Sequence, residues 1–364
     1  MSPCSYFLCL AERQTEKFAG LRIAGLSGIY HPKEFNLGHY ERPPFSAYGD
    51  VVSAYHVRNL DMFRLRQLRP QDNDKLSNPI DIMISHDWPG GIADYGDVEH
   101  LFRIKKFLKD DIQSGKLGNP AAGKLLHELR PKYWLAAHLH VAYAALVPHK
   151  AGENNQRPAP TKFLSLDKPI PQRQFLQILE LEMGENAEKV LSYDPEWLAI
   201  LKSTDEFSSV ETKHIYLPNP SEKEEEGGPR KDFRPTPQEL SAIAETLGDL
   251  RIKTDSFRQT APPLKLVNDV TRNAPSSAYY RNPQTAEFCQ WLGIKDVNKM
   301  LIEKEAEHVG TAWYLMSDEE KEKGAVMAGN QDDVDFGEED FVLDRGQEQD
   351  EPETKKVRLE EEVL

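Results

Sequence analysis

The sequence predicts an α/β fold with functional residues at the ends of its strands. Short apolar runs rich in β-branched residues alternate with amphipathic helical patterns from about residue 19 to residue 148. Two of these apolar runs end in histidine. No apolar run reaches the roughly 20 residues that a membrane-spanning helix needs, so we expect no membrane partner.

The elements follow one another in a regular order. The run LRIAGLSGIY predicts a strand ending in glycines, and SAYHVRNLDMFRLRQL predicts a helix with Val57, Leu60 and Leu68 on one face. A second strand is expected in PIDIMISHDW, followed by amphipathic helices in VEHLFRIKKFLKDDI and PAAGKLLHELR. Further strands are expected in YWLAAHLH, TKFLSLDK and QFLQILELEM. This alternation is typical of a sheet covered by helices.

The C-terminal part has a different composition. HKAGENNQRPAP predicts a loop, residues 217–235 predict an exposed linker, and PQELSAIAETL and QTAEFCQWLGI predict helices. The segment from Ser317 to Leu364 contains 18 acidic and 6 basic residues and few apolar ones, which predicts disorder. This tail contributes most of the formal net charge of −15, so the nearly neutral remainder is compatible with RNA binding.

Cysteine is scarce. The three cysteines, Cys4, Cys9 and Cys289, form no disulfide framework and indicate a reducing compartment.

The segment KYWLAAHLHVAYAAL places His138 and His140 two residues apart in an apolar run. In an extended strand both imidazoles point to the same side and can converge on one metal ion. The alternative is a pair of half-buried histidines that hydrogen-bond to neighbouring groups. His86 repeats the arrangement after the apolar strand Ile80 to Ile84, and two strands ending in histidine favour a site for zinc, iron or manganese.

These motifs resemble a known family. SHDWP, followed about 50 residues later by AHLH, is similar to the C-terminal half of the motif set of calcineurin-like metallophosphoesterases, and in detail to RNA lariat debranching enzymes. GLRIAGLSGIY, HYERPPF, AYHVRNLDMFRLRQL and TKFLSLDKPIPQRQFLQILEL extend the resemblance. The resemblance implies that His86, His138 and His140 are metal ligands. It also implies that the metal is divalent iron, zinc or manganese, and members of the family bind two such ions.

The resemblance also implies a reaction and a place for it. The reaction is metal-dependent hydrolysis of the 2′-5′ phosphodiester at the branch point of lariat intron RNA, a step of mRNA processing and intron turnover after splicing in the nucleus. The loop from His31 to Phe45 would recognise the lariat, with Lys33, His39, Tyr40, Arg42 and Phe45 as RNA-binding residues. Aromatic rings stack on exposed bases and cations pair with phosphates.

The sequence also departs from the family. It contains no Asp-x-His and no Gly-Asn-His-Glu, and no Gly-Asp follows an apolar strand. We expect residues 1–18 to lie outside the resemblance. We expect a partial metallophosphoesterase β-sandwich flanked by helices over residues 19–183, the debranching enzyme C-terminal domain over residues 184–316, and the acidic tail over residues 317–364.

Two functions remain open at this stage. The chain is a debranching phosphodiesterase in which metal is at most weakly bound, or a shortened, non-catalytic RNA-binding or interaction protein. The missing motifs identify no catalytic residue beyond the three histidines and predict little activity for these 364 residues.

Overall fold

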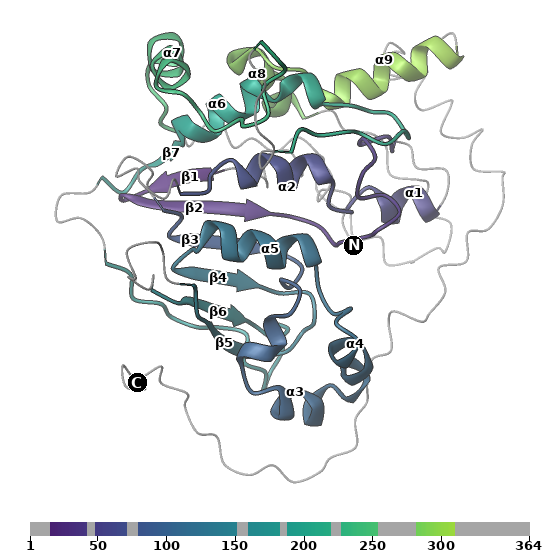
Figure 1. Cartoon of the computed structure of the whole chain (residues 1–364), viewed down its shortest axis with the longest axis vertical. Helices are drawn as coiled ribbons and strands as arrows, with labels where there is room; N and C mark the ends of the chain where they lie inside the picture. The colour runs from purple at the N-terminus through teal and green to yellow at the C-terminus, as the bar shows by residue number, and fades with distance from the viewer. Residues whose placement is uncertain are drawn as a thin grey trace, which may run out of the picture.

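The computed structural model describes residues 15–41, 48–70, 79–150, 159–182, 188–219, 227–253 and 282–309. Its centre is a seven-stranded sheet in the order β5-β6-β4-β3-β2-β1-β7 (Figure 1). β2, β3, β4 and β6 are successive parallel neighbours, whereas β1 and β5 run antiparallel to theirs. The strands are β1 (Thr15–Phe18), β2 (Leu21–Leu26), β3 (Ile82–Ser85), β4 (Tyr133–Ala136), β5 (Tyr143–Val147), β6 (Thr161–Ser165) and β7 (Leu191–Tyr193). The predicted α/β class is confirmed.

Helices surround this sheet. α2 and α5 lie against one face, α3 and α4 lie near the β5 edge, and α6 to α9 gather beyond the β7 edge (Figure 1). The helices are α1 (Tyr48–Ser53), α2 (Asn59–Arg66), α3 (Val98–Ile104), α4 (Lys109–Gln113), α5 (Pro120–Leu129), α6 (Pro195–Ser203), α7 (Pro237–Leu247), α8 (Pro283–Leu292) and α9 (Val297–Val309). In the described residues, no helix is both long enough and apolar enough to cross a membrane.

The two faces of the sheet differ in burial. Ala24, Met83, Trp134 and Phe163 occupy one row across β2, β3, β4 and β6, and all four are buried in the main core. The side chains of Leu125 and Leu126 from α5 complete this core. On the opposite face, Ile84 is 48% exposed and Leu146 is 52% exposed. The sheet therefore has one covered face and one face with exposed apolar side chains.

Local capping signals explain several helix starts. Asn119 accepts hydrogen bonds from the backbone N–H groups of Ala121 and Ala122, and Pro120 occupies the first turn of α5. Thr236 and Glu239 form a capping box at the start of α7. α5, α7 and α8 appear where the sequence predicts helices.

Some predicted elements are wrong. The helix expected over VEHLFRIKKFLKDDI is broken, because Lys105 has φ −125° and ψ 67°, and a 3₁₀ turn separates α3 from α4. The helix expected from Ser53 to Leu68 is shorter, and Leu60 packs in a separate cluster from Val57 and Leu68.

The strand expected over QFLQILELEM is absent in the described residues up to 182. Leu176 and Ile178 are exposed there, and none of the seven strands of the described sheet pairs with this run. A strand without a neighbour has no partner for its backbone hydrogen bonds.

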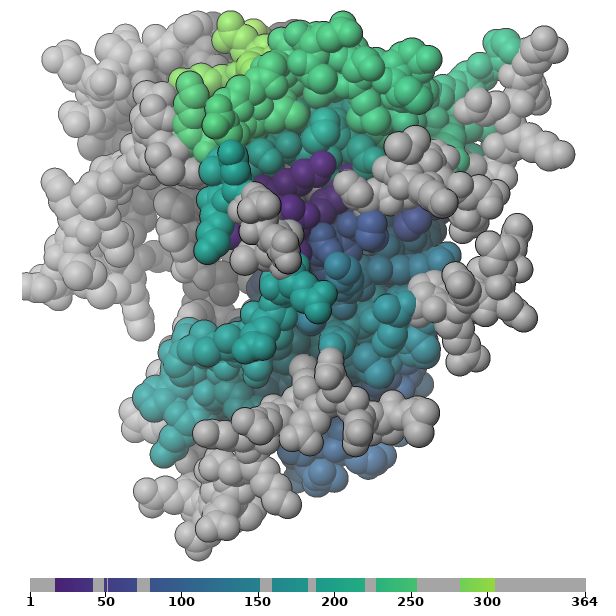
Figure 2. Space-filling view, turned by 90° about the vertical axis from the view of Figure 1, so that its left-hand side faces the viewer, coloured from purple at the N-terminus to yellow at the C-terminus, as the bar shows by residue number. Residues whose placement is uncertain are grey.

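The C-terminal section is joined to the sheet. The buried guanidinium of Arg22 on β2 pairs with Asp194 and Glu196 at the start of α6. Figure 2 views the side on which the parallel strands begin, where β1 (purple) lies between the green C-terminal helices and the blue and teal remainder of the sheet. The predicted acidic tail lies outside the described residues, and the predicted domain boundaries stay a prediction.

Candidate metal centre

Two of the predicted ligands meet where β3 and β4 end. His86 directly follows β3, and His138 lies two residues beyond β4. Because β3 and β4 are parallel neighbours, their carboxyl ends share one edge of the sheet. His86 Nε2 and His138 Nδ1 are 3.1 Å apart, and the ring planes are perpendicular with centroids 5.0 Å apart. The structure thus brings these two imidazoles together.

The backbone around His138 and His140 is not extended. β4 ends at Ala136, and His138 and His140 have φ values of 60° and 50°. The expectation that both side chains project from one face of a strand is therefore wrong. Left-handed backbone is uncommon outside glycine and gathers at functional sites, because the surrounding structure must compensate for its cost.

His140 stands apart from the close pair. In the part of the chain that the structure describes, His86, His138 and His140 are not a set whose donor atoms all lie within 4.8 Å. His140 is exposed, and its charge still acts on His138. The assignment of the three histidines as metal ligands stays a prediction.

Electrostatics favour neutral imidazole at this edge. Burial lowers the pKa of His138, and nearby His140 lowers it further. The pKa of His140 is lowered by burial and by Lys168 and Lys105, against the opposing effect of Asp167. Neutral imidazole is the form that binds metal.

Buried groups hold the two turns in place. Trp88 Nε1 donates to the carbonyl of Ala137 at 2.9 Å, and Trp134 Nε1 donates to Ser85 Oγ at 2.9 Å. The backbone N–H of Ala137 donates to the carbonyl of His86 at 3.1 Å. These contacts fix the loop after β4 to the loop after β3.

Asp87, next to His86, is a buried carboxylate. It accepts hydrogen bonds from the backbone N–H groups of Trp88 at 2.9 Å and Tyr30 at 3.3 Å. Burial raises its pKa, although these two bonds and the charge of His86 lower it. Its contacts thus join the turn after β3 to the loop after β2.

The predicted RNA-binding residues lie on the loop after β2. Lys33 is exposed. His39 is half-buried, with Nε2 3.7 Å from Asp61 Oδ2. The Tyr40 hydroxyl is hydrogen-bonded to Ser53 Oγ at 3.0 Å. Arg42 and Phe45 lie outside the described residues, so the structure tests neither.

The buried side chain of Arg58 holds this loop in place through hydrogen bonds. Its side chain is buried, and it donates to the carbonyls of Gly38, His56 and Ser53 at 3.2, 3.1 and 3.3 Å. It also pairs with Glu41, whose carboxylate is equally buried. The guanidinium therefore fixes the path of the loop.

Sequence reasoning missed one cluster. His31, Glu34 and His56 bring their donor atoms within 4.8 Å of one another. The spacing His-x-x-Glu places two of these residues on one side of a helical turn, which is the signal that was available in the sequence. The third residue lies 22 positions further along the chain.

The fold and the histidine pair define an α/β protein whose candidate functional side chains gather at the carboxyl edge of parallel strands. A family model described as "Lariat debranching enzyme, C-terminal domain" matches residues 158–297. The chain is 60% identical over 361 residues to the lariat debranching enzyme of Caenorhabditis elegans, which covers 99% of this chain and 70% of that protein. The chain belongs to the lariat debranching enzyme family.

More distant relatives carry the same name. The chain is 59% identical over 344 residues to the lariat debranching enzyme of Caenorhabditis briggsae, covering 94% of this chain and 66% of that protein. It is 39% identical over 311 residues to the one of Homo sapiens, covering 85% of this chain and 54% of that protein. The chain thus spans about half to 70% of the length of these relatives. The comparisons favour an enzyme of RNA lariat debranching, a hydrolase, over a non-catalytic RNA-binding protein.

Proposed function

We propose that this chain acts in metal-dependent hydrolysis of the 2′-5′ phosphodiester of branched intron RNA, with His86, His138 and His140 as metal ligands. The observation that carries the proposal is the 3.1 Å approach of His86 Nε2 to His138 Nδ1 at the ends of two parallel strands. Ligands of α/β proteins bind outside the carboxyl ends of the strands, and this is where the pair lies.

The donor set suits zinc, iron or manganese. These metals accept imidazole nitrogen, and a site built from a few protein ligands keeps positions open for water or substrate. When bound, such an ion polarises the phosphoryl oxygen and supplies a hydroxide nucleophile at neutral pH. The lowered pKa of His138, caused mainly by burial, keeps its ring in the ligand form.

The exposed face of the sheet supports a more specific assignment of the fold. We propose that the sheet is one layer of a calcineurin-like metallophosphoesterase sandwich, because parallel strands are usually covered on both faces. The support is the exposure of Ile84 and Leu146 on the face away from α2 and α5. The sequence motifs around His86 and His138 point to the same architecture.

The loop after β2 is the proposed lariat-binding surface. Lys33 is exposed and is suited to a phosphate, while Tyr40 is half-buried and its aromatic ring is of the kind that stacks on bases. Arg42 and Phe45 would extend this surface. Because branched intron RNA is the proposed partner, we also propose the nucleus as the location of the protein.

The proposal is tested with the purified chain, Mn²⁺ or Zn²⁺, and a branched RNA carrying one 2′-5′ linkage. We expect slow, metal-dependent cleavage at the branch that is abolished in His138→Ala and absent on a linear 3′-5′ RNA. His127→Ala is the matched control, since its imidazole lies on α5 and contacts His149, which follows β5, and not the residues that follow β3 and β4. Cleavage that survives His138→Ala, or that needs no metal, contradicts the proposal.

A further inference from the structure

A second cluster of metal-binding side chains lies outside the pair formed by His86 and His138. In the described residues, His31, Glu34 and His56 are the one set of three such side chains whose donor atoms all lie within 4.8 Å of one another. They share no residue with the proposed metal ligands His86, His138 and His140, although His31 and Glu34 lie on the proposed lariat-binding loop.

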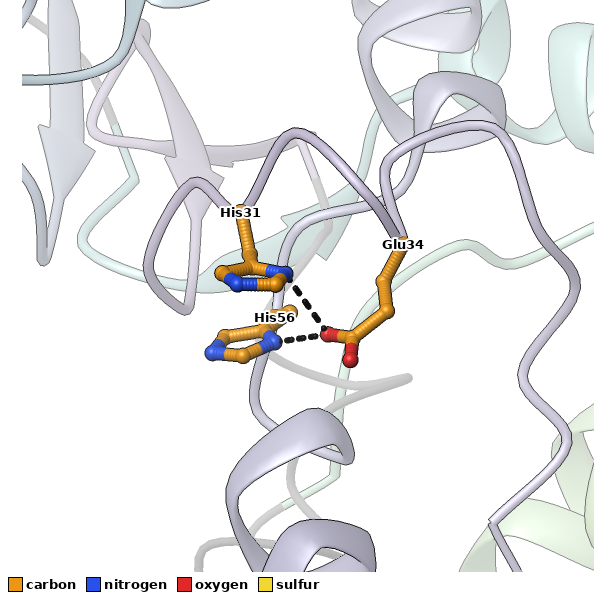
Figure 3. Close-up of side chains that lie close together, drawn as sticks. All are labelled: His31, Glu34 and His56. Atoms are coloured by element: carbon orange, nitrogen blue, oxygen red, sulfur yellow. Dashed lines mark hydrogen bonds and ion pairs between the residues drawn. The ribbon is translucent and has the colours of Figure 1, made fainter.

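The three side chains face one another. Figure 3 shows the imidazole rings of His31 and His56 one above the other, with the Glu34 carboxylate beside the same edge of both. The ring centroids are 4.7 Å apart and the planes differ by 14°. His31 Nδ1 is 3.2 Å from Glu34 Oε2, and His56 Nδ1 is hydrogen-bonded to the same oxygen.

These separations are close to those of a zinc site. With bonds of about 2.0–2.1 Å in tetrahedral geometry, neighbouring donor atoms lie about 3.3–3.5 Å apart. To share one ion, the donors of His31, Glu34 and His56 need to move by roughly 1–1.5 Å. The two stacked rings must also tilt so that both Nδ1 lone pairs point at the ion. Two histidines, one carboxylate and one water complete a tetrahedral shell.

The backbone holds the ligands before any metal binds. The N–H groups of Glu34 and Phe35 donate to the carbonyl of His31 at 3.2 and 3.0 Å, so a helical turn presents residues 31 and 34 on one side. His56 is bridged to Ile29, and the N–H of the next residue donates to the Ile29 carbonyl at 2.9 Å. Such preorganisation lowers the cost of binding.

One donor atom lacks a hydrogen bond. The His31 side chain is 39% exposed, but its Nδ1 atom is buried and makes no hydrogen bond, although it lies 3.2 Å from Glu34 Oε2. Buried polar atoms without a partner are rare and call for an explanation such as an ion. A metal ion between the two imidazoles and the carboxylate would give this nitrogen a direct bond in place of the missing hydrogen bond.

We propose that His31, Glu34 and His56 bind one divalent transition metal ion, with zinc as the best-suited ion, and that this ion clips the loop after β2 to the end of α1. Binding requires the His56 proton to move from Nδ1 to Nε2, so that the Nδ1 lone pair faces the ion in place of the hydrogen bond to Glu34. The proposal does not depend on the debranching reaction.

The test measures zinc binding by equilibrium dialysis and titration calorimetry on the whole chain carrying His138→Ala, which removes a ligand of the other candidate site. We expect one zinc ion per chain in this background. Removal of a group that merely orients a ligand typically weakens metal affinity 10–100-fold, so His31→Ala or Glu34→Gln is expected to weaken binding by at least about 10-fold.

The matched control is His39→Ala, which removes a half-buried imidazole from the same loop outside the cluster. It is expected to leave zinc affinity unchanged, and circular dichroism checks that each variant is folded. The proposal is overturned if the His138→Ala chain binds no zinc, or if His31→Ala and His39→Ala bind it equally well. An independent readout is the visible absorption of bound Co²⁺, measured for His31→Ala and His39→Ala in a chain that keeps His138.

Discussion

Replacement of Arg58 by methionine is expected to destabilise the protein by about 3–5 kcal/mol. The Arg58 side chain is 1% exposed and its partner Glu41 is 3% exposed. Removing one member of such a pair leaves a buried charge without compensation, which typically costs about that much. The change also leaves the carbonyls of Gly38 and His56 without their donor. Methionine fills a similar volume, so the lost charge and hydrogen bonds dominate the effect.

A double-mutant cycle separates the charge from the packing. Glu41→Gln removes the carboxylate charge, and in the Arg58→Met background it is expected to recover part of the lost stability, because no unpaired buried charge remains. The free energy of unfolding is measured by urea titration of the wild type, both single variants and the double variant. A cost below about 1 kcal/mol for Arg58→Met, or no recovery in the double variant, refutes this account.

Three further outcomes are expected. Gly28→Ala lowers the thermal midpoint strongly, since Gly28 has φ 97° and an added Cβ would lie 2.2 Å from the Tyr55 carbonyl oxygen. Gly91→Ala, at φ 80° but with open space around the added Cβ, lowers the free energy of unfolding by only about 1–2 kcal/mol. Tyr143→Phe costs about 0.5–1.5 kcal/mol at pH 8, through loss of the hydrogen bond to Ala93. Burial and nearby carboxylates raise the pKa of Tyr143 to about 12, so its stabilisation is lost as pH rises from about 10 to 12, as urea titrations of both proteins will test. In rate assays with branched RNA, these 364 residues turn over at least about 10²-fold more slowly than the Caenorhabditis elegans relative. The reason is that they contain no Asp-x-His, no Gly-Asn-His-Glu and no Gly-Asp after an apolar strand, which the resemblance leads us to expect in an active enzyme. Equal rates contradict this.

Helix starts were predictable because their signals are local. Asn119 with Pro120, and Thr236 with Glu239, satisfy backbone groups within one turn of their own helix. The run from Gln174 to Met183 shows the limit of the same approach. Its apolar residues favour a strand, but a strand also needs a neighbouring strand to pair with, and in the described sheet no strand pairs with this run.

The meeting of His86 and His138 followed from one general rule. Parallel neighbouring strands end on the same edge, so residues that follow them lie close together. The orientation of the His138 ring did not follow, because the left-handed backbone at residues 138 and 140 depends on contacts such as the Trp88 bond to the Ala137 carbonyl. The cluster of His31, Glu34 and His56 was not predicted. It depends on the isolated β-bridge between Ile29 and His56, which brings together two loops that are distant in the sequence.

The two histidine clusters are connected through Asp87. Its carboxylate accepts hydrogen bonds from Trp88 in the turn that carries His86 and from Tyr30, the residue directly before His31. Because one buried side chain accepts hydrogen bonds from both turns, we expect a shift of the loop after β2 to be passed to the turn that carries His86. Metal binding at His31 and His56 would therefore also restrain the candidate debranching site, through a path made only of backbone amides and one carboxylate.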